Sequence, residues 1–226
     1  GAGKSTLLRM INRLIDPSDG LISFNGVDIT RLRGAALRDW RRRSAMIFQQ
    51  FNLVPRLSVL TNVCLGFLGQ ISRLRGTLGR FSYREKQQAI RALQRVGIAD
   101  HALKRGSQLS GGQQQRAAIA RSLGQGSEIL SADEPIASLD PSSARRVMDI
   151  LADLNRNDGI TVLVSLHQVE YALNYCPRTI ALRDGEIVFD GASSALTPAF
   201  LGELYGAESE ELFLPRVGET TPAQTT

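Results

Sequence analysis

Three short stretches of the chain hold residue types that can bind phosphate groups, and one of them also holds a group that can activate water. The first is GAGKST, where Gly3-Lys4-Ser5 fits the end of the phosphate-loop pattern G-x-x-x-x-G-K-[ST] and Gly1 fits its inner glycine. Small residues let backbone N–H groups close on phosphate oxygens, and a helix N-terminus adds positive potential. Lys4 is expected to reach the β- and γ-phosphates, and Ser5 to hold Mg²⁺. A glycine-rich turn that merely opens a helix is the alternative.

The second stretch is ILSADEP (129–135), an apolar strand that ends in two carboxylates. In P-loop ATPases an acidic residue at a strand end completes the Mg²⁺ site beside the phosphate loop, and Asp133 fits that position. Glu134 follows directly, points differently, and can polarise an attacking water as a general base. A solvated acidic pair is the alternative, but the phosphate loop in the same chain favours the magnesium site.

The third stretch is LSGGQQQR (109–116). Ser110, Gly111 and Gly112 are predicted to lie at another helix N-terminus, which is another ready anion site. A glycine-containing helix cap is the plainer explanation. If both stretches bind phosphate, either the chain binds two anions, or two copies of the chain share one.

Helices are predicted from the spacing of apolar residues. Leu7, Leu8, Ile11 and Ile15 share one face, so the phosphate loop should open a helix over 4–15. Further helices are expected over 83–97, where Gly97 is placed as a stop, from Ser110 onward, and from Asp140-Pro141 to about Gly159.

Strands are predicted before and after a long helical stretch at 52–122. Short apolar strands are expected at 44–50, 128–132 and 160–165, the last with apolar residues on both faces, as in a central parallel strand. Hairpins are expected at 21–29 and 179–191, around Asn-Gly and Asp-Gly turns. The pattern predicts an α/β core with a helical insertion and no internal repeats.

Composition is that of a globular protein, with 42% hydrophobic and 22% charged residues among 226. No apolar run approaches the roughly 18 residues that span a bilayer, and no secretory signal is visible. Cys64 and Cys176 stand in unrelated contexts, which favours reduced thiols over a disulfide. The net charge is +5, and residues 31–43 hold many arginines. Nucleic acid or anionic lipid is a possible partner of such a segment, but without interleaved aromatic residues we favour a solvated surface.

Taken in order, these motifs resemble those of the ATP-binding cassette (ABC) family over residues 1 to about 206. GAGKST resembles the Walker A loop, ILSADE the Walker B strand and LSGGQQQR the signature. Gln49 in MIFQQFNLVP resembles the Q-loop glutamine, with Gln50 as the neighbouring candidate. SLD (138–140) resembles the D-loop, and His167 in SLHQ resembles the switch histidine.

The resemblance implies a P-loop (RecA-like) nucleotide-binding domain. Its core would be discontinuous, formed by 1–51 and 123–206, with the signature in an inserted helical subdomain at 52–122 and a disordered acidic, Thr- and Pro-containing tail at 207–226. The family carries further strands before the Walker A loop, including an aromatic residue that stacks on adenine. We therefore expect this chain to be a fragment of a longer one that binds nucleotide poorly by itself.

The resemblance also implies roles for individual residues. Family members pair head-to-tail, so that the Walker A loop of one copy and the signature of the other enclose one ATP. The catalytic residues would be Glu134, His167 and Gln49, and the Mg²⁺ ligands Ser5, Asp133 and Gln49. The ATP phosphates would be bound by Gly1, Ala2, Gly3, Lys4, Ser5 and Thr6. The signature in trans would be Ser110, Gly111, Gly112 and Gln113, and the D-loop Ser138, Leu139 and Asp140.

Within the family, FQQFNLVPRLSVLTNV (48–63) resembles importers, in which this surface receives a helix of the membrane permease. GTLGRFS (76–82) and the segments around 105–123 and 158–172 resemble the phosphonate-import ATPases. A periplasmic or lipid-anchored binding protein and a location on the cytoplasmic face of the bacterial inner membrane are then implied. An importer of another ligand (a phosphate ester or an amino acid), a soluble ABC ATPase and an inactive subunit are the alternatives. One departure is Ser131, where the family prefers an aliphatic residue; its hydroxyl is expected to bond a neighbouring carbonyl.

Overall fold

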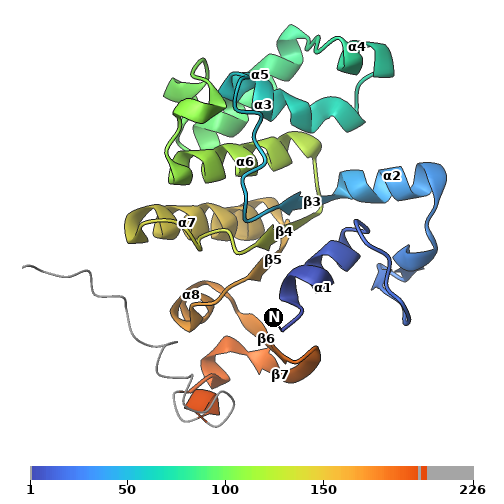
Figure 1. The fold of residues 1–226 in the computed structure, drawn as a ribbon, viewed down its shortest axis with the longest axis vertical. Coiled ribbons are helices and arrows are strands. Elements are labelled where there is room, and N and C mark those ends of the chain that lie inside the picture. Colours follow the sequence, from blue (N-terminus) through green and yellow to red (C-terminus); the bar gives the residue numbers. More distant parts are fainter. Residues whose placement is uncertain (1, 198–199, 203–226) are drawn as a thin grey trace, which may run out of the picture. The chain divides into compact units, whose positions relative to one another are not determined.

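The computed structural model describes residues 2–197 and 200–202 of the chain (Figure 1). They form two compact units: one runs from Gly3 to Ser165, and the other holds Ala2 and the residues after Ser165. The predicted tail, 207–226, lies outside the described residues. The predicted division into a core (1–51 and 123–206) and a helical subdomain (52–122) is a different one from these two units, and it stays a prediction.

A three-stranded parallel sheet forms the centre of the first unit. Its strands are β3 (Ser44–Ile47), β4 (Ile129–Asp133) and β5 (Thr161–Ser165), in the order β3-β4-β5. All five residues of β4 are buried, and Ala132 lies opposite Ile47 on one side and Val164 on the other. Because parallel strands run the same way, all three end at one edge of the sheet.

The prediction that 160–165 forms a central strand is wrong for the described part of the chain. There β5 pairs with β4 alone, and β4 is the central strand. An apolar run on both faces indicates that layers cover the sheet above and below. It carries no information about whether a further strand pairs along the edge.

The helices surround this sheet in βα order, so the predicted α/β fold is confirmed. In the first unit they are α1 (Lys4–Ile11), α2 (Gly34–Arg43), α3 (Val59–Cys64), α4 (Arg73–Thr77), α5 (Tyr83–Arg95), α6 (Gly111–Gln125) and α7 (Pro141–Asp158). Helix α1 packs on β4 and β5, α2 and α6 pack on β3, and α7 packs on β5. Short 3₁₀ turns lie among them, η1 (Ile29–Arg31), η2 (Leu65–Gly69), η3 (Ala99–His101) and η4 (Gly106–Gln108).

The first helix ends earlier than predicted, at Ile11 rather than residue 15. Asn12 Nδ2 donates to the Leu8 carbonyl oxygen at 2.8 Å, and Arg13 has a φ of 53°, in the left-handed region. The Arg13 side chain is buried and donates to the Ile29 carbonyl and to Asp16. The chain therefore turns toward the predicted hairpin, and Ile15 is exposed rather than on the helix face.

Residues 52–122 are mainly helical as predicted, and helices α5 and α7 begin and end where their capping residues indicate. Ser82 and Glu85 form a capping box at the start of α5, and Gly97 follows its end with a φ of 68°. Asp140 caps α7, and Gly159 ends it with a φ of 68°. Helices α3, α5 and α6 pack on one another (Figure 1).

A small apolar cluster joins the predicted hairpin to the sheet. The hairpin is β1 (Ser23–Phe24) paired with β2 (Val27–Asp28). Trp40 of α2 is 2% exposed, its ring lies 5.3 Å from that of Phe24, and it packs with Ile29 and Ile129. Its Nε1 donates to the Ile11 carbonyl oxygen at 2.9 Å, which ties α2 to the end of α1.

Ser131 differs from expectation. It is fully buried in β4, and its hydroxyl has no hydrogen-bond partner among the described residues. Side chains of a strand leave the plane of the sheet, whereas its backbone carbonyls point within that plane to the neighbouring strands, so the expected bond to a neighbouring carbonyl does not form.

The second unit contains helix α8 (Val169–Tyr175), the antiparallel hairpin β6 (Arg178–Arg183) and β7 (Glu186–Ala192), and the 3₁₀ turn η5 (Ser193–Ala195). The hairpin is the one predicted, with Asp184 and Gly185 both at positive φ in the turn. Cys176 of this unit is a free, half-buried thiol, and Cys64 of α3 is a free, buried one. Across the described helices, none has the length and hydrophobicity needed to cross a bilayer.

Candidate nucleotide-binding site

The phosphate-loop residues occupy the start of α1. Gly3 precedes the helix with a φ of 91°, a conformation that glycine adopts without strain. Lys4, Ser5 and Thr6 form the first turn, whose backbone N–H groups have no acceptor within the helix and therefore suit an anion. Gly1 lies outside the described residues, and Ala2 is grouped with the second unit.

Ser5 and Asp133 are brought together across 128 residues of sequence. The Ser5 hydroxyl donates to Asp133 Oδ1 at 2.8 Å, and the Ser165 hydroxyl donates to the same oxygen at 2.9 Å. Asp133 is only 4% exposed. A buried carboxylate normally needs a cationic or hydrogen-bonded partner, and here the Ser5 and Ser165 donors are neutral hydroxyls. A hydroxyl beside a carboxylate is the oxygen donor set that Mg²⁺ prefers when phosphates complete its shell, so these residues fit Mg²⁺.

Glu134 directly follows β4 in an unusual backbone conformation. Its φ is 48°, and its N–H donates to the Ser165 hydroxyl oxygen at 2.9 Å. A left-handed residue other than glycine costs about 1–3 kcal/mol, and such strain gathers at functional sites. The reversal turns the chain away from the strand direction, so Glu134 and Asp133 project differently, as a water-activating group beside a metal ligand must.

The two glutamines lie at the same edge of the sheet. β3 ends at Ile47, so Phe48 separates the strand from Gln49, contrary to the expectation that the glutamine follows it directly. Gln49 and Gln50 are both exposed, so burial does not distinguish which of them is the Q-loop glutamine. The segment after them is held by α6: Arg121 donates to the Asn52 carbonyl oxygen at 2.6 Å and the Phe51 carbonyl oxygen at 3.3 Å. Burial of the Arg121 guanidinium lowers its pKa.

The signature residues begin α6 as predicted. The Ser110 hydroxyl accepts from the Gln113 N–H at 3.4 Å, and Gln113 Oε1 accepts from the Ser110 N–H at 3.0 Å. These reciprocal bonds form a capping box. The N–H groups of Gly111 and Gly112 belong to the helix turn that has no internal acceptors.

The D-loop lies directly against the signature within one chain. A β-carbon at Gly112 would stand 2.8 Å from that of Ser143, and one at Gly111 would stand 3.5 Å from Leu139 Cδ2. Glycine is therefore required at 112 by the close approach of α7. Asp140 accepts from the N–H groups of Ser142 and Ser143 at 3.1 and 3.0 Å, and its hydrogen bonds hold its pKa far below the usual carboxyl range.

The roles of all the predicted site residues stay predictions, those of Ser138 and His167 among them. Ser138 is exposed and lies in the turn before α7. His167 is exposed, follows β5 by two residues and belongs to the second unit.

The sequence reasoning missed two residues. Ser165 contacts Asp133 and the backbone of Glu134, and Ser143 packs on Gly112. Ser165 could have been found, because it ends the strand beside β4 and parallel strands end at one edge. Ser143 depends on how two helices pack, for which the sequence has no local signal.

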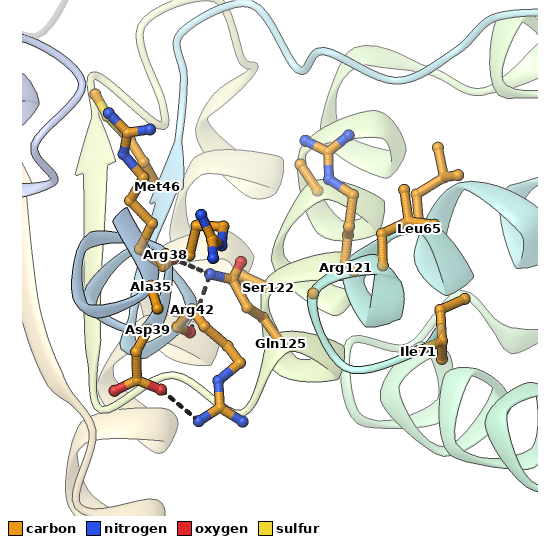
Figure 2. A pocket seen from close by; sticks show the side chains of 15 residues that line it. Ala35, Arg38, Asp39, Arg42, Met46, Leu65, Ile71, Arg121, Ser122 and Gln125 are labelled. Atoms are coloured by element: carbon orange, nitrogen blue, oxygen red, sulfur yellow. Dashed lines mark hydrogen bonds and ion pairs between the residues drawn. The ribbon is translucent and has the colours of Figure 1, made fainter. Parts of the chain in front are cut away.

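An arginine-lined groove of about 750 Å³ lies beside β3. Figure 2 shows Arg38, Asp39 and Arg42 of α2 on one side, and Arg121 of α6 with Leu65 of η2 on the other. Arg42 pairs with Asp39 at 2.7 Å, and Gln125 Nε2 donates to the Arg41 and Arg42 carbonyl oxygens. Part of the arginine cluster at 31–43 thus lines a hollow rather than a plain solvated face.

A loop that opens a helix, a strand-end aspartate bonded to that helix and a strained glutamate beside it define a P-loop ATPase. The family model described as ABC transporter matches residues 1–137, and the chain belongs to that family. It is an ABC-type ATPase cassette that binds ATP.

Two curated relatives carry nearly the same name. Phosphonates import ATP-binding protein PhnC of Rhizobium meliloti (strain 1021) is 58% identical over 209 residues, which cover 92% of this chain and 75% of the relative. Phosphonates import ATP-binding protein PhnC 1 of Pseudomonas aeruginosa (strain UCBPP-PA14) is 59% identical, with 93% and 77% covered.

Solved structures of ABC cassettes share the fold. The dimeric structure of MJ0796, a bacterial ABC transporter cassette, matches with a TM-score of 0.74 at 34% identity, over 85% of this chain and 81% of that one. A dimeric post-hydrolysis structure of MJ0796 bound to ADP and Pi matches with a TM-score of 0.72 at 34% identity over the same shares.

Proposed function

We propose that this chain is the ATP-hydrolysing subunit of an ABC importer that takes up phosphonates across the cell membrane. The ATPase assignment depends most on one observation, the Ser5–Asp133 hydrogen bond, which unites the phosphate loop with the strand-end carboxylate. The choice of phosphonate is supported by the names of relatives that are 53–59% identical to most of the chain.

In the first step the start of α1 binds the ATP phosphates. Backbone N–H groups of the first turn and the Lys4 ammonium neutralise the phosphate oxygens. Ser5 and Asp133 would hold Mg²⁺, with Gln49 as a further ligand, and the bound ion would neutralise part of the phosphate charge. Ser165 keeps the Asp133 carboxylate oriented toward Ser5.

In the hydrolytic step Glu134 accepts a proton from the attacking water. Its left-handed backbone, fixed by the bond to Ser165, sets the direction of the side chain before ATP arrives. Lys4 and His167 stabilise the charge that develops on the γ-phosphate. A strained but prepositioned base avoids the cost of ordering it during the reaction.

The complete site requires a second copy of the chain, paired head-to-tail. The signature residues, Ser110 to Gln113, would contact the γ-phosphate of ATP bound to the other copy. Because the D-loop packs on the signature within one chain, a change at one phosphate can move both segments together.

The membrane partner is proposed to dock at the groove between α2 and α6, next to the segment that follows Gln49. Arg121 lines this groove and also binds the backbone at Phe51 and Asn52, which gives a direct path from the groove to the Q-loop. The chain would then lie at the cytoplasmic face of the bacterial inner membrane, held by the permease, which in turn receives phosphonate from a periplasmic or lipid-anchored binding protein.

Growth on phosphonate tests this function. A strain lacking the gene for this chain should fail to grow with phosphonate as sole phosphorus source and grow normally on phosphate. The wild-type gene should restore growth, and a Glu134→Gln allele should not. Normal growth of the deletion strain, in a genome without a second phosphonate system, would contradict phosphonate import. The chain would then belong to an importer of another ligand or act as a soluble ABC ATPase.

A further inference from the structure

The Gln113 carboxamide joins the first turn of α6 to a histidine on a neighbouring turn. Its oxygen accepts from the Ser110 N–H at 3.0 Å, and its nitrogen lies 2.8 Å from His101 Nε2. Since the oxygen is committed to a backbone donor, the group facing the imidazole is the NH₂, which only donates. His101 Nε2 must therefore accept, and it does so only when it carries no proton.

This assignment fixes the state of the imidazole. A neutral ring with a bare Nε2 carries its proton on Nδ1. His101 Nδ1 is buried and has no hydrogen-bond partner among the described residues. An unpaired buried polar atom is costly, and in a folded protein it calls for an explanation. The ring keeps this geometry because its other nitrogen bonds Gln113.

The turn that carries His101 is itself attached to α6. The His101 N–H donates to the Ile98 carbonyl oxygen at 3.0 Å, and the His101 carbonyl oxygen accepts from Lys104 N–H at 3.0 Å. Arg116 of α6 donates to the Val96 and Gly97 carbonyl oxygens at 3.2 and 3.0 Å. The backbone segment that leads to His101 is thus hydrogen-bonded to α6, which limits how far the imidazole can move relative to this helix.

We propose that His101 is a positioning residue for the signature. Its neutral imidazole orients the Gln113 carboxamide, which holds the Ser110 backbone and keeps the start of α6 shaped for the γ-phosphate of ATP on a second copy. His101 itself touches no nucleotide and acts only through Gln113. The proposal rests on the composite site of the proposed function.

The test measures ATP-driven association of cassettes that carry Glu134→Gln, which retain ATP. His101→Phe keeps a flat ring and removes the acceptor. It should weaken association about tenfold, because the Gln113 carboxamide is then no longer held in place at either of the two composite sites. His101→Gln places an acceptor oxygen near the position of Nε2 and should restore the parent's value.

Three controls separate positioning from a general loss of structure. ATP affinity measured at concentrations too low for pairing should be unchanged in His101→Phe, because Lys4 and Ser5 are intact. The free energy of unfolding should fall by no more than about 1 kcal/mol, the usual contribution of one hydrogen bond. In a Gln113→Leu background, His101→Phe should have no further effect, since the bond is already absent.

The outcomes distinguish this inference from the proposed function. Ser110→Arg should abolish ATP-driven association; if it does not, the composite site is wrong. If Ser110→Arg abolishes association while His101→Phe matches the parent, the role of His101 is overturned. Weak association in both His101→Phe and His101→Gln would also overturn it, because the acceptor would then not be the feature that counts.

Discussion

Ser5, Asp133 and Ser165 come from three different elements, and their side chains meet at one carboxylate oxygen. Glu134 is joined to the same group through its backbone N–H. The Ser165 hydroxyl therefore contacts the Asp133 carboxylate and the Glu134 backbone at once. In the proposed function, these two contacts place Asp133 at the metal and Glu134 near the attacking water.

Replacing Glu134 by Gln should lower ATP turnover by at least about a hundredfold, because the general base is lost. ATP binding should survive, since Lys4, Ser5 and Asp133 are untouched, and the variant should accumulate as an ATP-bound dimer. Steady-state phosphate release and size-exclusion chromatography with ATP measure the two effects. Turnover close to that of the parent would remove Glu134 from its role.

Ser131→Ala should raise the free energy of unfolding by about 1 kcal/mol, because it removes a buried hydroxyl that has no partner. Ser122 is the matched control: it is also buried, but its hydroxyl donates to the Ile119 carbonyl oxygen at 2.7 Å. Ser122→Ala should lower stability by about 1 kcal/mol. Urea unfolding followed by the fluorescence of Trp40, the one tryptophan of the chain, compares them. Equal losses would show that Ser131 has a partner after all.

At the scale of elements, the start of α7 holds the D-loop against the signature. Asp140 caps this helix through two backbone N–H groups, and Ser143 on its first turn packs on Gly112. The cap therefore controls the position of the D-loop as well as the stability of the helix.

The hydrogen bonds of Asp140 lower its pKa from 3.8 in the folded state, so its charge stabilises the fold. That contribution is complete above the ordinary carboxyl pKa and is lost as the pH falls through the lower folded value. Asp140→Asn should therefore be less stable than the parent at pH 7, with a smaller difference at pH 3. A difference in stability that is independent of pH would show that the charge of Asp140 contributes nothing.

Local sequence signals predicted the elements well and their packing less well. The caps at Ser110 and Asp140 and the turn at Asp184-Gly185 depend on neighbouring residues, and these predictions are confirmed. The meeting of Ser5 and Asp133 was also predictable, because a strand-end carboxylate and a phosphate loop occur in one chain. The early end of α1 was not predictable, because the buried Arg13 side chain donates a hydrogen bond to the Ile29 carbonyl oxygen, which is distant in the sequence. The contact of Gly112 with Ser143 likewise depends on tertiary packing.

At the scale of the whole molecule, the Walker A loop and the signature belong to one chain but are proposed to act on ATP in different copies. Mixing two defective copies tests this arrangement. In a Glu134→Gln background, Lys4→Ala removes phosphate binding and Ser110→Arg blocks the signature, so neither variant should pair with itself when ATP is added. A tagged copy of one should capture the other in the presence of ATP, because the mixed dimer keeps one intact site. Capture that is equally strong without ATP would contradict head-to-tail pairing around nucleotide.

The most direct test of the central claim is uptake of a radiolabelled phosphonate into right-side-out membrane vesicles that contain the chain and its permease. The vesicles are loaded with ATP, and the binding protein is supplied outside. The account predicts accumulation that requires internal ATP and stops in the Glu134→Gln variant, while the label stays outside when phosphonate-binding protein is omitted. Sustained ATP hydrolysis by vesicles that accumulate no phosphonate would contradict it.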